Sequence, residues 1–293
     1  MGLRLKFNVV LFAVFVVGLA ASGYTSWELL RRNALDEVVR SAGLMMETAL
    51  AIRAYTIEQV RPKLEAAASE TFLPQTVPAF AATETLKALR KKYPDYTYKE
   101  ATINPTNVRD LPADWEAELV HAFRRGSATG ELRGQRLTET GTALYVARPI
   151  KVGNPACLTC HSTPDVAPAS MITAYGSANG FGWNLNEIVG AQIVSVPMDL
   201  PIRNAKTAFV TFMGSLAAAF GVLFVAVNLM LSRMIVRPLS RMSHTADQVS
   251  TGDFKVPEFA ERGRDEVARL GRAFNRLRRS LEQAMQMIDR GRA

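Results

Sequence analysis

The feature that most constrains this chain is an uncharged apolar run over residues 207–231, which contains no Asp, Glu, Lys or Arg. A helix rises about 1.5 Å per residue, so this run would be roughly 37 Å long, enough to cross a bilayer core of about 30 Å. A soluble core helix of that length would need a polar stripe, which this run lacks. The sequence therefore predicts a transmembrane helix over residues 207–231.

A second apolar block begins at Phe7 and extends to Trp27. A signal peptide cut after Ala20 is the alternative, but the run is slightly long for a signal-peptide core and is followed by amphipathic helix. We expect a retained transmembrane helix over residues 7–27, because the rest of the topology needs it.

Basic residues set the expected orientation of both helices. Arg4 and Lys6 precede the first helix, and Arg233, Arg237 and Arg241 follow the second. Lys and Arg are retained on the cytoplasmic side of membranes. We therefore expect residues 1–6 and 232–293 in the cytoplasm and residues 28–206 in the periplasm, with the chain in a bacterial inner membrane.

Both cysteines of the chain fall in one Cys-x-x-Cys-His motif, at residues 157–161. This spacing is that of c-type haem attachment, in which each thiol adds to a haem vinyl group and the adjacent histidine ligates the iron. A zinc site would want four ligands, and a thioredoxin-like dithiol would want a βαβ context and no histidine. The motif predicts one covalently bound haem c per chain, with thioethers at Cys157 and Cys160 and His161 as the proximal iron ligand.

The motif does not fix the distal iron ligand. We expect a long helix from about Glu28 to Glu65, and the 3.6-residue period groups one mostly apolar face of it. That face consists of Leu44, Thr48, Ala51, Ile52 and Tyr55. Tyr55 lies near its centre, where it could line a haem pocket, and Met45 flanks it. Tyr55 and Met45 are therefore candidates for the distal side, and the further candidates are Met46, His121 and Met171; a packing role is the alternative for each.

The rest of the outer segment predicts a mixed α+β domain. β-prone runs with alternation occur over residues 94–102 and 142–152, and residues 192–196 have the pattern of a buried strand. Residues 115–125 are helical in pattern, and Asp114 lies at the start of that helix.

Several motifs of the outer segment occur in an order found in a known family. They are Ala51–Thr56 with Val60–Pro62, Asn104–Asn107 with Trp115–Glu116, Pro149–Ile150, Cys157–His161, Tyr175–Gly176, Gly180–Trp183 and Gly190–Pro197. With them the segment resembles the PAS-like periplasmic c-type haem sensor family. The resemblance implies a small antiparallel sheet flanked by helices and one covalent haem. Some members use a distal cysteine on the N-terminal helix; this sequence has none there, and Tyr55 stands near that position.

The residues after the second apolar run carry two heptad seams. The first contains Leu239, Met242, Ala246 and Val249, and the second contains Val267, Leu270, Phe274, Leu277, Leu281, Ala284 and Ile288. One seam cannot bury itself in a monomer of two short helices, whereas two chains can form a parallel four-helix bundle. Through Pro238, Gly252-Asp253 and Asp265-Glu266, residues 231–285 resemble a HAMP domain.

The position of the basic residues weighs against a nucleic-acid partner. From Ser232 onward, 13 basic and 8 acidic residues supply most of the net charge of +8. Basic helices can bind nucleic-acid phosphates, but these arginines follow a predicted membrane helix, so a surface facing membrane lipid is the better interpretation. We find no constellation typical of an enzyme.

The leading hypothesis is a homodimeric transmembrane haem sensor. It would relay a redox or diatomic-gas signal through the HAMP domain to a separate cytoplasmic signalling protein. The alternative is a membrane-anchored c-type cytochrome that passes electrons to a periplasmic partner. A third hypothesis is a haem-dependent scaffold whose tail only recruits a partner.

Overall fold

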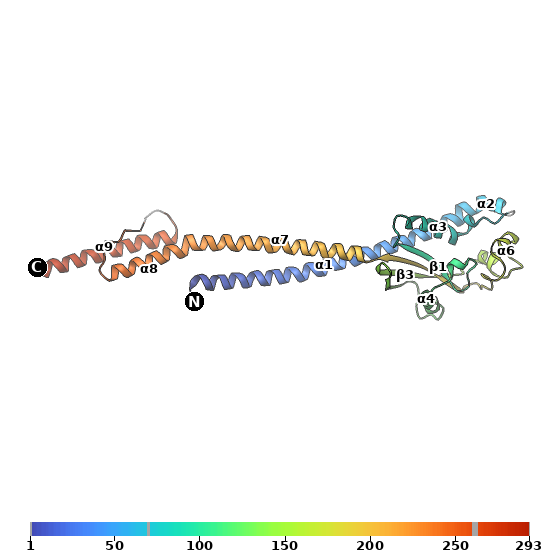
Figure 1. Cartoon of the computed structure of the whole chain (residues 1–293), viewed down its shortest axis with the longest axis horizontal. Helices are drawn as coiled ribbons and strands as arrows, with labels where there is room; N and C mark the ends of the chain where they lie inside the picture. The colour runs from blue at the N-terminus through green and yellow to red at the C-terminus, as the bar shows by residue number, and fades with distance from the viewer. Residues whose placement is uncertain (1, 69–70, 260–262, 293) are drawn as a thin grey trace. The chain divides into compact units, whose positions relative to one another are not determined.

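The computed structural model of the chain describes residues 2–68, 71–259 and 263–292. The chain divides into two compact units, one comprising Trp27–Ala208 and the other Met1–Ser26 with Phe209–Ala293. Helices α1 (Leu3–Tyr55) and α7 (Asp199–Leu231) each contribute to both units (Figure 1). The outermost residues of the two predicted cytoplasmic segments, Met1 and Ala293, lie outside the described residues.

A four-stranded antiparallel sheet forms the centre of the unit Trp27–Ala208. Its strands are β1 (Thr97–Thr102), β2 (Leu132–Thr138), β3 (Gly141–Lys151) and β4 (Ile188–Pro197), in the order β1-β4-β3-β2. The central strand β4 is buried along almost its whole length, as its run of apolar residues predicts. The predicted α+β class is confirmed, but the sequence pattern does not predict the edge strand β2.

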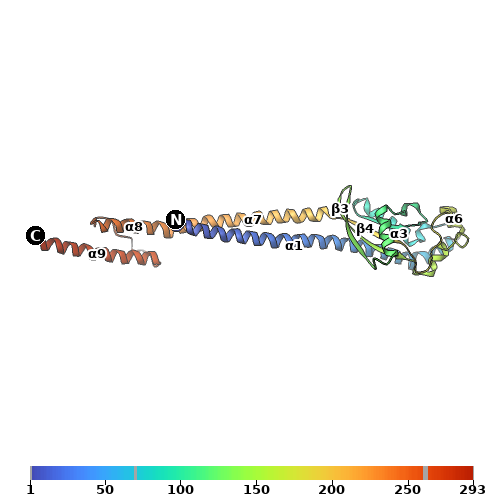
Figure 2. The same ribbon diagram turned by 90° about the horizontal axis from the view of Figure 1, so that it is seen from below.

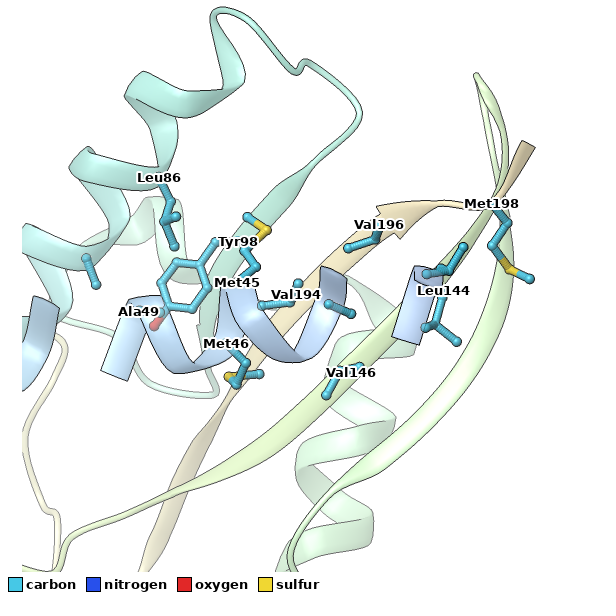
Figure 3. Packing of buried hydrophobic residues seen from close by; sticks show 13 residues of the cluster. Met45, Met46, Ala49, Leu86, Tyr98, Leu144, Val146, Val194, Val196 and Met198 are labelled. Carbon is cyan, nitrogen blue, oxygen red and sulfur yellow. The ribbon is translucent and has the colours of Figure 1, made fainter. Parts of the chain in front are cut away.

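Helices α1 and α3 (Pro78–Arg90) cover one face of the sheet. Met45, Met46 and Ala49 of α1 are buried there, and Figure 3 shows them between α3 and the strands. The cluster also contains Leu86 of α3, Tyr98 of β1, Leu144 and Val146 of β3, and Val194 and Val196 of β4. Burial of this apolar face holds α1 against the sheet.

Helix α4 (Asp114–Arg124) covers the opposite face of the sheet. It agrees with the helix predicted over residues 115–125. Its Val120 and Phe123 pack against a cluster that includes Ala101, Ala191 and Ile193 of the strands. The Glu116 side chain accepts a hydrogen bond from the backbone N–H of Ala113 at 2.8 Å, which satisfies a donor at the helix start.

The remaining helical segments of this unit are short. They are α2 (Arg61–Ala68), α5 (Leu158–His161), α6 (Ala169–Tyr175), the 3₁₀ turns Pro74–Thr76, Val108–Asp110 and Pro155–Cys157, and a π-helical segment, Thr56–Val60. The π-helical segment joins α1 to α2, so the helical chain continues past Tyr55, in agreement with the predicted extent to about Glu65.

Two helices of the described chain are long and apolar enough to cross a membrane, Arg4–Leu64 and Asp199–Ser250. They contain the two predicted spans, residues 7–27 and 207–231. Within the second unit the ring of Phe15 on α1 stacks on that of Phe220 on α7, with centroids 4.9 Å apart. Val17 and Val222 are 68% and 72% exposed, which suits side chains that face lipid.

The same unit ends in helices α8 (Arg237–Ser250) and α9 (Glu266–Arg292) (Figure 2). Gly252, with φ +91°, follows the end of α8, and the Asp265 carboxylate accepts from the backbone N–H of Ala268 at 2.7 Å at the start of α9. Gly252 and Asp265, which carry the HAMP resemblance, thus lie at the boundaries of the two helices. The seam residues Leu270, Leu277 and Leu281 are exposed in the single chain, and the side chain of Ile288 lies outside the described residues.

Candidate functional site

The Cys-x-x-Cys-His motif folds as two consecutive helical turns. Cys157 ends a 3₁₀ turn, and Cys160 and His161 lie on the single turn of α5. The side-chain oxygen of Asn154 accepts a hydrogen bond from the backbone N–H of Ala156 at 2.9 Å, which fixes the start of the first turn. Residues three apart on a helical turn share one side, so both thiols are presented together.

His161 is held in one orientation by its neighbours. Its Nδ1 lies 2.7 Å from the carbonyl oxygen of Gly180, and its ring stacks on that of Trp183 at 3.9 Å. A carbonyl oxygen only accepts, so Nδ1 carries the proton and the lone pair of Nε2 is available to a metal. Burial lowers the pKa of His161, although the bond to Gly180 opposes this, and the neutral ligand form is thereby favoured.

Gly180 and Trp183, the two neighbours of His161, lie on a loop after α6, and Asn104 binds that loop through hydrogen bonds. The Asn104 side chain accepts from the backbone N–H of Gly180 at 3.0 Å and donates to the carbonyl of Phe181 at 3.1 Å. Gly180 has φ +86°, and a Cβ there would lie 2.1 Å from Oγ1 of Thr106. Two motifs that carry the family resemblance, at residues 104–107 and 180–183, therefore meet at His161.

A cavity of about 280 Å³ adjoins the motif. Its lining includes Cys157, Cys160, His161, Trp183, Met171, Tyr175, Phe72, Phe80, Ile57, Val189 and Thr106. This lining is largely apolar, as in sites for cofactors. The buried hydroxyl of Thr106, a residue of the lining, has no hydrogen-bond partner among the described residues. The donor set and the apolar walls both fit a covalently attached haem.

The charged residues of the cavity also fit that group. Basic side chains outnumber acidic ones in the lining, which contains Arg53, Arg61, Arg109 and Lys151 against Glu100 and Asp110. Arg53 pairs with Glu100, and Arg109 with Glu84 and Asp110. Arg61 and Lys151 have no ion pair among the described residues, so they are available to the two carboxylates of a haem.

Burial raises the pKa of two groups in the lining. For the Cys160 thiol, burial outweighs the opposing charge of Arg61. For Asp110, burial raises the pKa to about 6 against the opposing charge of Arg109. Among the described residues, no cluster of three or more His, Cys, Asp or Glu side chains could hold a bare metal ion.

A buried hydrogen-bond network begins at the cavity wall. The Arg53 guanidinium of α1 donates to the Glu100 carboxylate of β1, which also accepts from the Tyr98 hydroxyl at 2.7 Å. The Gln192 amide of β4 donates to that hydroxyl at 3.3 Å. The network thus links α1, β1 and β4. Sequence reasoning missed it, although a charged residue in a buried strand, such as Glu100, signals that a partner exists.

The structure places the candidate distal residues in very different surroundings. Met45 and Met46 lie in the hydrophobic cluster under α1, and Tyr55 is 62% exposed. Neither Met45 nor Tyr55 lines the cavity. His121 is exposed on α4, so Met171, which is 3% exposed, is the one of the five in the lining.

One sequence interpretation is corrected by this arrangement. From the sequence, Tyr55 could line a haem pocket on the face that it shares with Leu44, Thr48 and Ala51, but these four residues are exposed and none of them lines the cavity. The residues of this helical stretch that line the cavity are Arg53, Ile57 and Arg61. The face of α1 that packs on the sheet is instead the apolar one that contains Met45, Met46 and Ala49.

Two known proteins are similar to parts of this chain. A crystal structure of the cyanobacterial heme-protein Tll0287 is similar over 55% of this chain and 95% of its own, with 17% identity and a TM-score of 0.43. The sensor histidine kinase WalK of Bacillus subtilis (strain 168) is 33% identical over 124 residues, which are 42% of this chain and 20% of the kinase. The chain thus spans about a fifth of that relative's length.

Matches to family descriptions divide the chain in the same way. Residues 230–291 match the HAMP domain, which confirms the signalling module predicted after the second apolar run. Residues 31–197, more than half of the chain, match the Tll0287-like family. The chain therefore belongs to the Tll0287-like family and joins that sensor domain to a HAMP domain.

Proposed function

We propose that the chain is a transmembrane sensor that binds one haem c covalently and relays a redox or diatomic-gas signal through its HAMP domain to a separate signalling protein. The observation that carries the proposal is the orientation of His161, whose Nδ1 is bonded to Gly180 beside two free thiols. A bound haem would supply an iron that changes oxidation state or takes a diatomic gas.

The residues of the site have separate roles in holding this group. Cys157 and Cys160 would hold the haem through two thioethers, each formed when the S–H of the thiol adds across a vinyl C=C bond. His161 offers Nε2 to the iron, and Trp183 and Gly180 keep its ring in place. Arg61 and Lys151 would neutralise the two carboxylates of the haem.

The connection to the membrane supports sensing. The buried network reaches Arg53 on α1 and Gln192 on β4. Helix α1 contains the first predicted span, and β4 ends at Pro197, directly before α7, which contains the second. A change in charge or packing at the cavity wall therefore acts on both elements that lead to the membrane.

We propose the topology predicted from the sequence for this sensor. The spans are residues 7–27 and 207–231 in a bacterial inner membrane, residues 28–206 lie in the periplasm, and residues 1–6 and 232–293 lie in the cytoplasm. The chain works as a parallel homodimer with its apolar helices in lipid. Because the matched part is a fifth of the kinase, its activity is not carried over, and we assign no catalysis to this chain.

The full chain, matured with a cytochrome c assembly system and held in lipid nanodiscs, tests the cofactor assignment. Intact mass should show one haem per chain, and the oxidised and reduced optical spectra should be those of a c-type haem. A Cys157→Ser, Cys160→Ser variant should lose the covalent haem, and His161→Ala should keep the thioethers but change the spectrum. A chain of unmodified mass, or a His161→Ala spectrum equal to the wild type, would overturn the proposal.

A further inference from the structure

Helix α1 carries an outward row of residues in the sensor unit. Its members are Ser41, Leu44, Thr48, Ala51 and Tyr55, spaced 3, 4, 3 and 4 residues apart. Leu44 is 69% exposed and Tyr55 62% exposed, Thr48 and Ala51 are also exposed, Ser41 is half-buried, and no member is charged. The spacing is that of the positions by which two helices pack in a coiled coil.

The row differs from the rest of the exposed surface of α1. A neighbouring strip carries Asp36, Arg40 and Glu47, and Glu47 pairs with Arg148 of the sheet at 2.7 Å. That strip has the composition of a solvated surface. In the row, the hydroxyl of Thr48 donates to the carbonyl of Leu44 at 2.7 Å, so this hydroxyl has its hydrogen bond within the helix.

The size of the side chains also suits helix pairing. Leu44 and Tyr55 are large, while Ser41 and Ala51 are small, which allows the knobs of one helix to enter the spaces on another. The row extends over 15 residues, from Ser41 to Tyr55, and at about 1.5 Å per residue it is roughly 21 Å long. This length gives four helical turns for contact.

We propose that this row is the surface through which the sensor domains of two copies of the chain meet, with α1 of one copy parallel to α1 of the other. The inference rests on the proposed function, because it takes the membrane topology from there. Leu270, Leu277 and Leu281 of the HAMP seam are exposed in the single chain and require a second copy.

Membrane topology then favours a second copy as the occupant of the row. Two chains joined at HAMP have both sensor domains on the same side of the membrane, and this tethering raises their effective concentration for each other. Lipid does not suit the row, because Ser41 lies 14 residues, or about 21 Å of helix, beyond the end of the predicted span at Trp27.

This surface has a consequence for signalling. Arg53 and Ile57, which line the cavity, lie on the same helical stretch as Ala51 and Tyr55. One helical stretch therefore meets the haem site on one side and the partner on another. A shift of α1 at the cavity would change the packing of the row between the two copies.

Cysteine cross-linking in the haem-loaded full chain tests the inference. Leu44→Cys, Ala51→Cys and Tyr55→Cys each add the one reactive thiol, because the native cysteines are in thioethers. With a short bismaleimide in membranes, we expect a dimer of twice the chain mass, about fivefold more than for the controls Asp36→Cys and Ala54→Cys. Both controls are exposed on α1 outside the row.

A second variant tests the contribution of the apolar contact. Leu44→Glu should reduce the cross-linking of Ala51→Cys about fivefold while leaving the haem spectrum unchanged, because Leu44 is exposed in the single chain. Equal yields in the row and the controls, with a Leu270→Cys dimer intact, would overturn the inference and leave the proposed function standing. A product of another mass would equally overturn it. Loss of covalent haem would instead refute the proposed function.

Discussion

At the scale of single residues, the orientation of His161 depends on Gly180. Gly180→Ala would add a Cβ 2.1 Å from Oγ1 of Thr106, at a φ of +86°. We expect the substitution to displace the loop, weaken the bond to Nδ1 of His161 and cost roughly 1–3 kcal/mol of stability. Thermal unfolding and the optical spectrum of the haem-loaded chain measure both effects.

Gly182→Ala is the matched control for this substitution. Gly182 has a similar φ of +79°, but nothing lies within 4 Å of the added Cβ. It should therefore show the cost of backbone strain alone and keep the wild-type spectrum. If both variants change the spectrum equally, the contact with Thr106 is not what positions His161.

The raised pKa of Asp110 predicts that the stability of the fold depends on pH. Burial raises its pKa to about 6 from its ordinary 3.8. The folded chain thus binds this proton more tightly than the unfolded chain, so the contribution is full below about pH 4 and is lost as pH rises through about 6. Solvent screening at this partly exposed carboxyl keeps the contribution below about 3 kcal/mol. Asp110→Asn should flatten the pH dependence of the unfolding midpoint between pH 4 and 6. An unchanged pH dependence would show that Asp110 is not its cause.

At the scale of elements, the Arg53–Glu100 pair fastens α1 to β1. Arg53→Met should cost roughly 3–5 kcal/mol, because it leaves the Glu100 charge buried without its partner. Arg53→Met with Glu100→Gln should recover much of that loss. Denaturant unfolding of the four proteins in a double-mutant cycle measures the coupling. Additive losses would show that the pair does not hold the two elements together.

Some elements of secondary structure are predictable from the local sequence and others are not, for physical reasons. The apolar run of β4 and the Asp265 start of α9 are local signals, and both predict their elements. Strand β2 is polar in alternation and becomes a strand by pairing with β3, so nothing local marks it. For α1, periodicity groups the face that contains Leu44 and Tyr55, whereas the sheet covers the face that contains Met45, Met46 and Ala49.

The site was predictable to a similar degree. The motif at residues 157–161 and the loop motifs at residues 104–107 and 180–183 are visible in the sequence. Their meeting at His161 is not, because it depends on a contact between Asn104 and Gly180. The distal side could not be assigned for the same reason, since Tyr55 and Arg53 are close in sequence and only packing decides which lines the cavity.

At the scale of the whole molecule, the proposed sensor consists of two chains. Leu277 is 57% exposed on α9. Leu277→Arg should leave the single-chain fold intact but weaken the HAMP dimer, because it places a charge in the seam. Native electrophoresis in mild detergent measures the dimer fraction, with Arg276→Ala on the neighbouring exposed position as the control. A dimer fraction equal to that of the control would show that the seam is not the contact.

In the proposed sensor, a change at the haem reaches the HAMP domain. The most direct measurement is bismaleimide cross-linking at Leu270→Cys in the haem-loaded full chain in nanodiscs, compared between oxidised, reduced and reduced, CO-bound states under anaerobic conditions. The account predicts that the yield differs at least about twofold between two of these states, and that the difference vanishes in His161→Ala. Equal yields in all three states of a haem-loaded chain would contradict it and favour a membrane-anchored cytochrome.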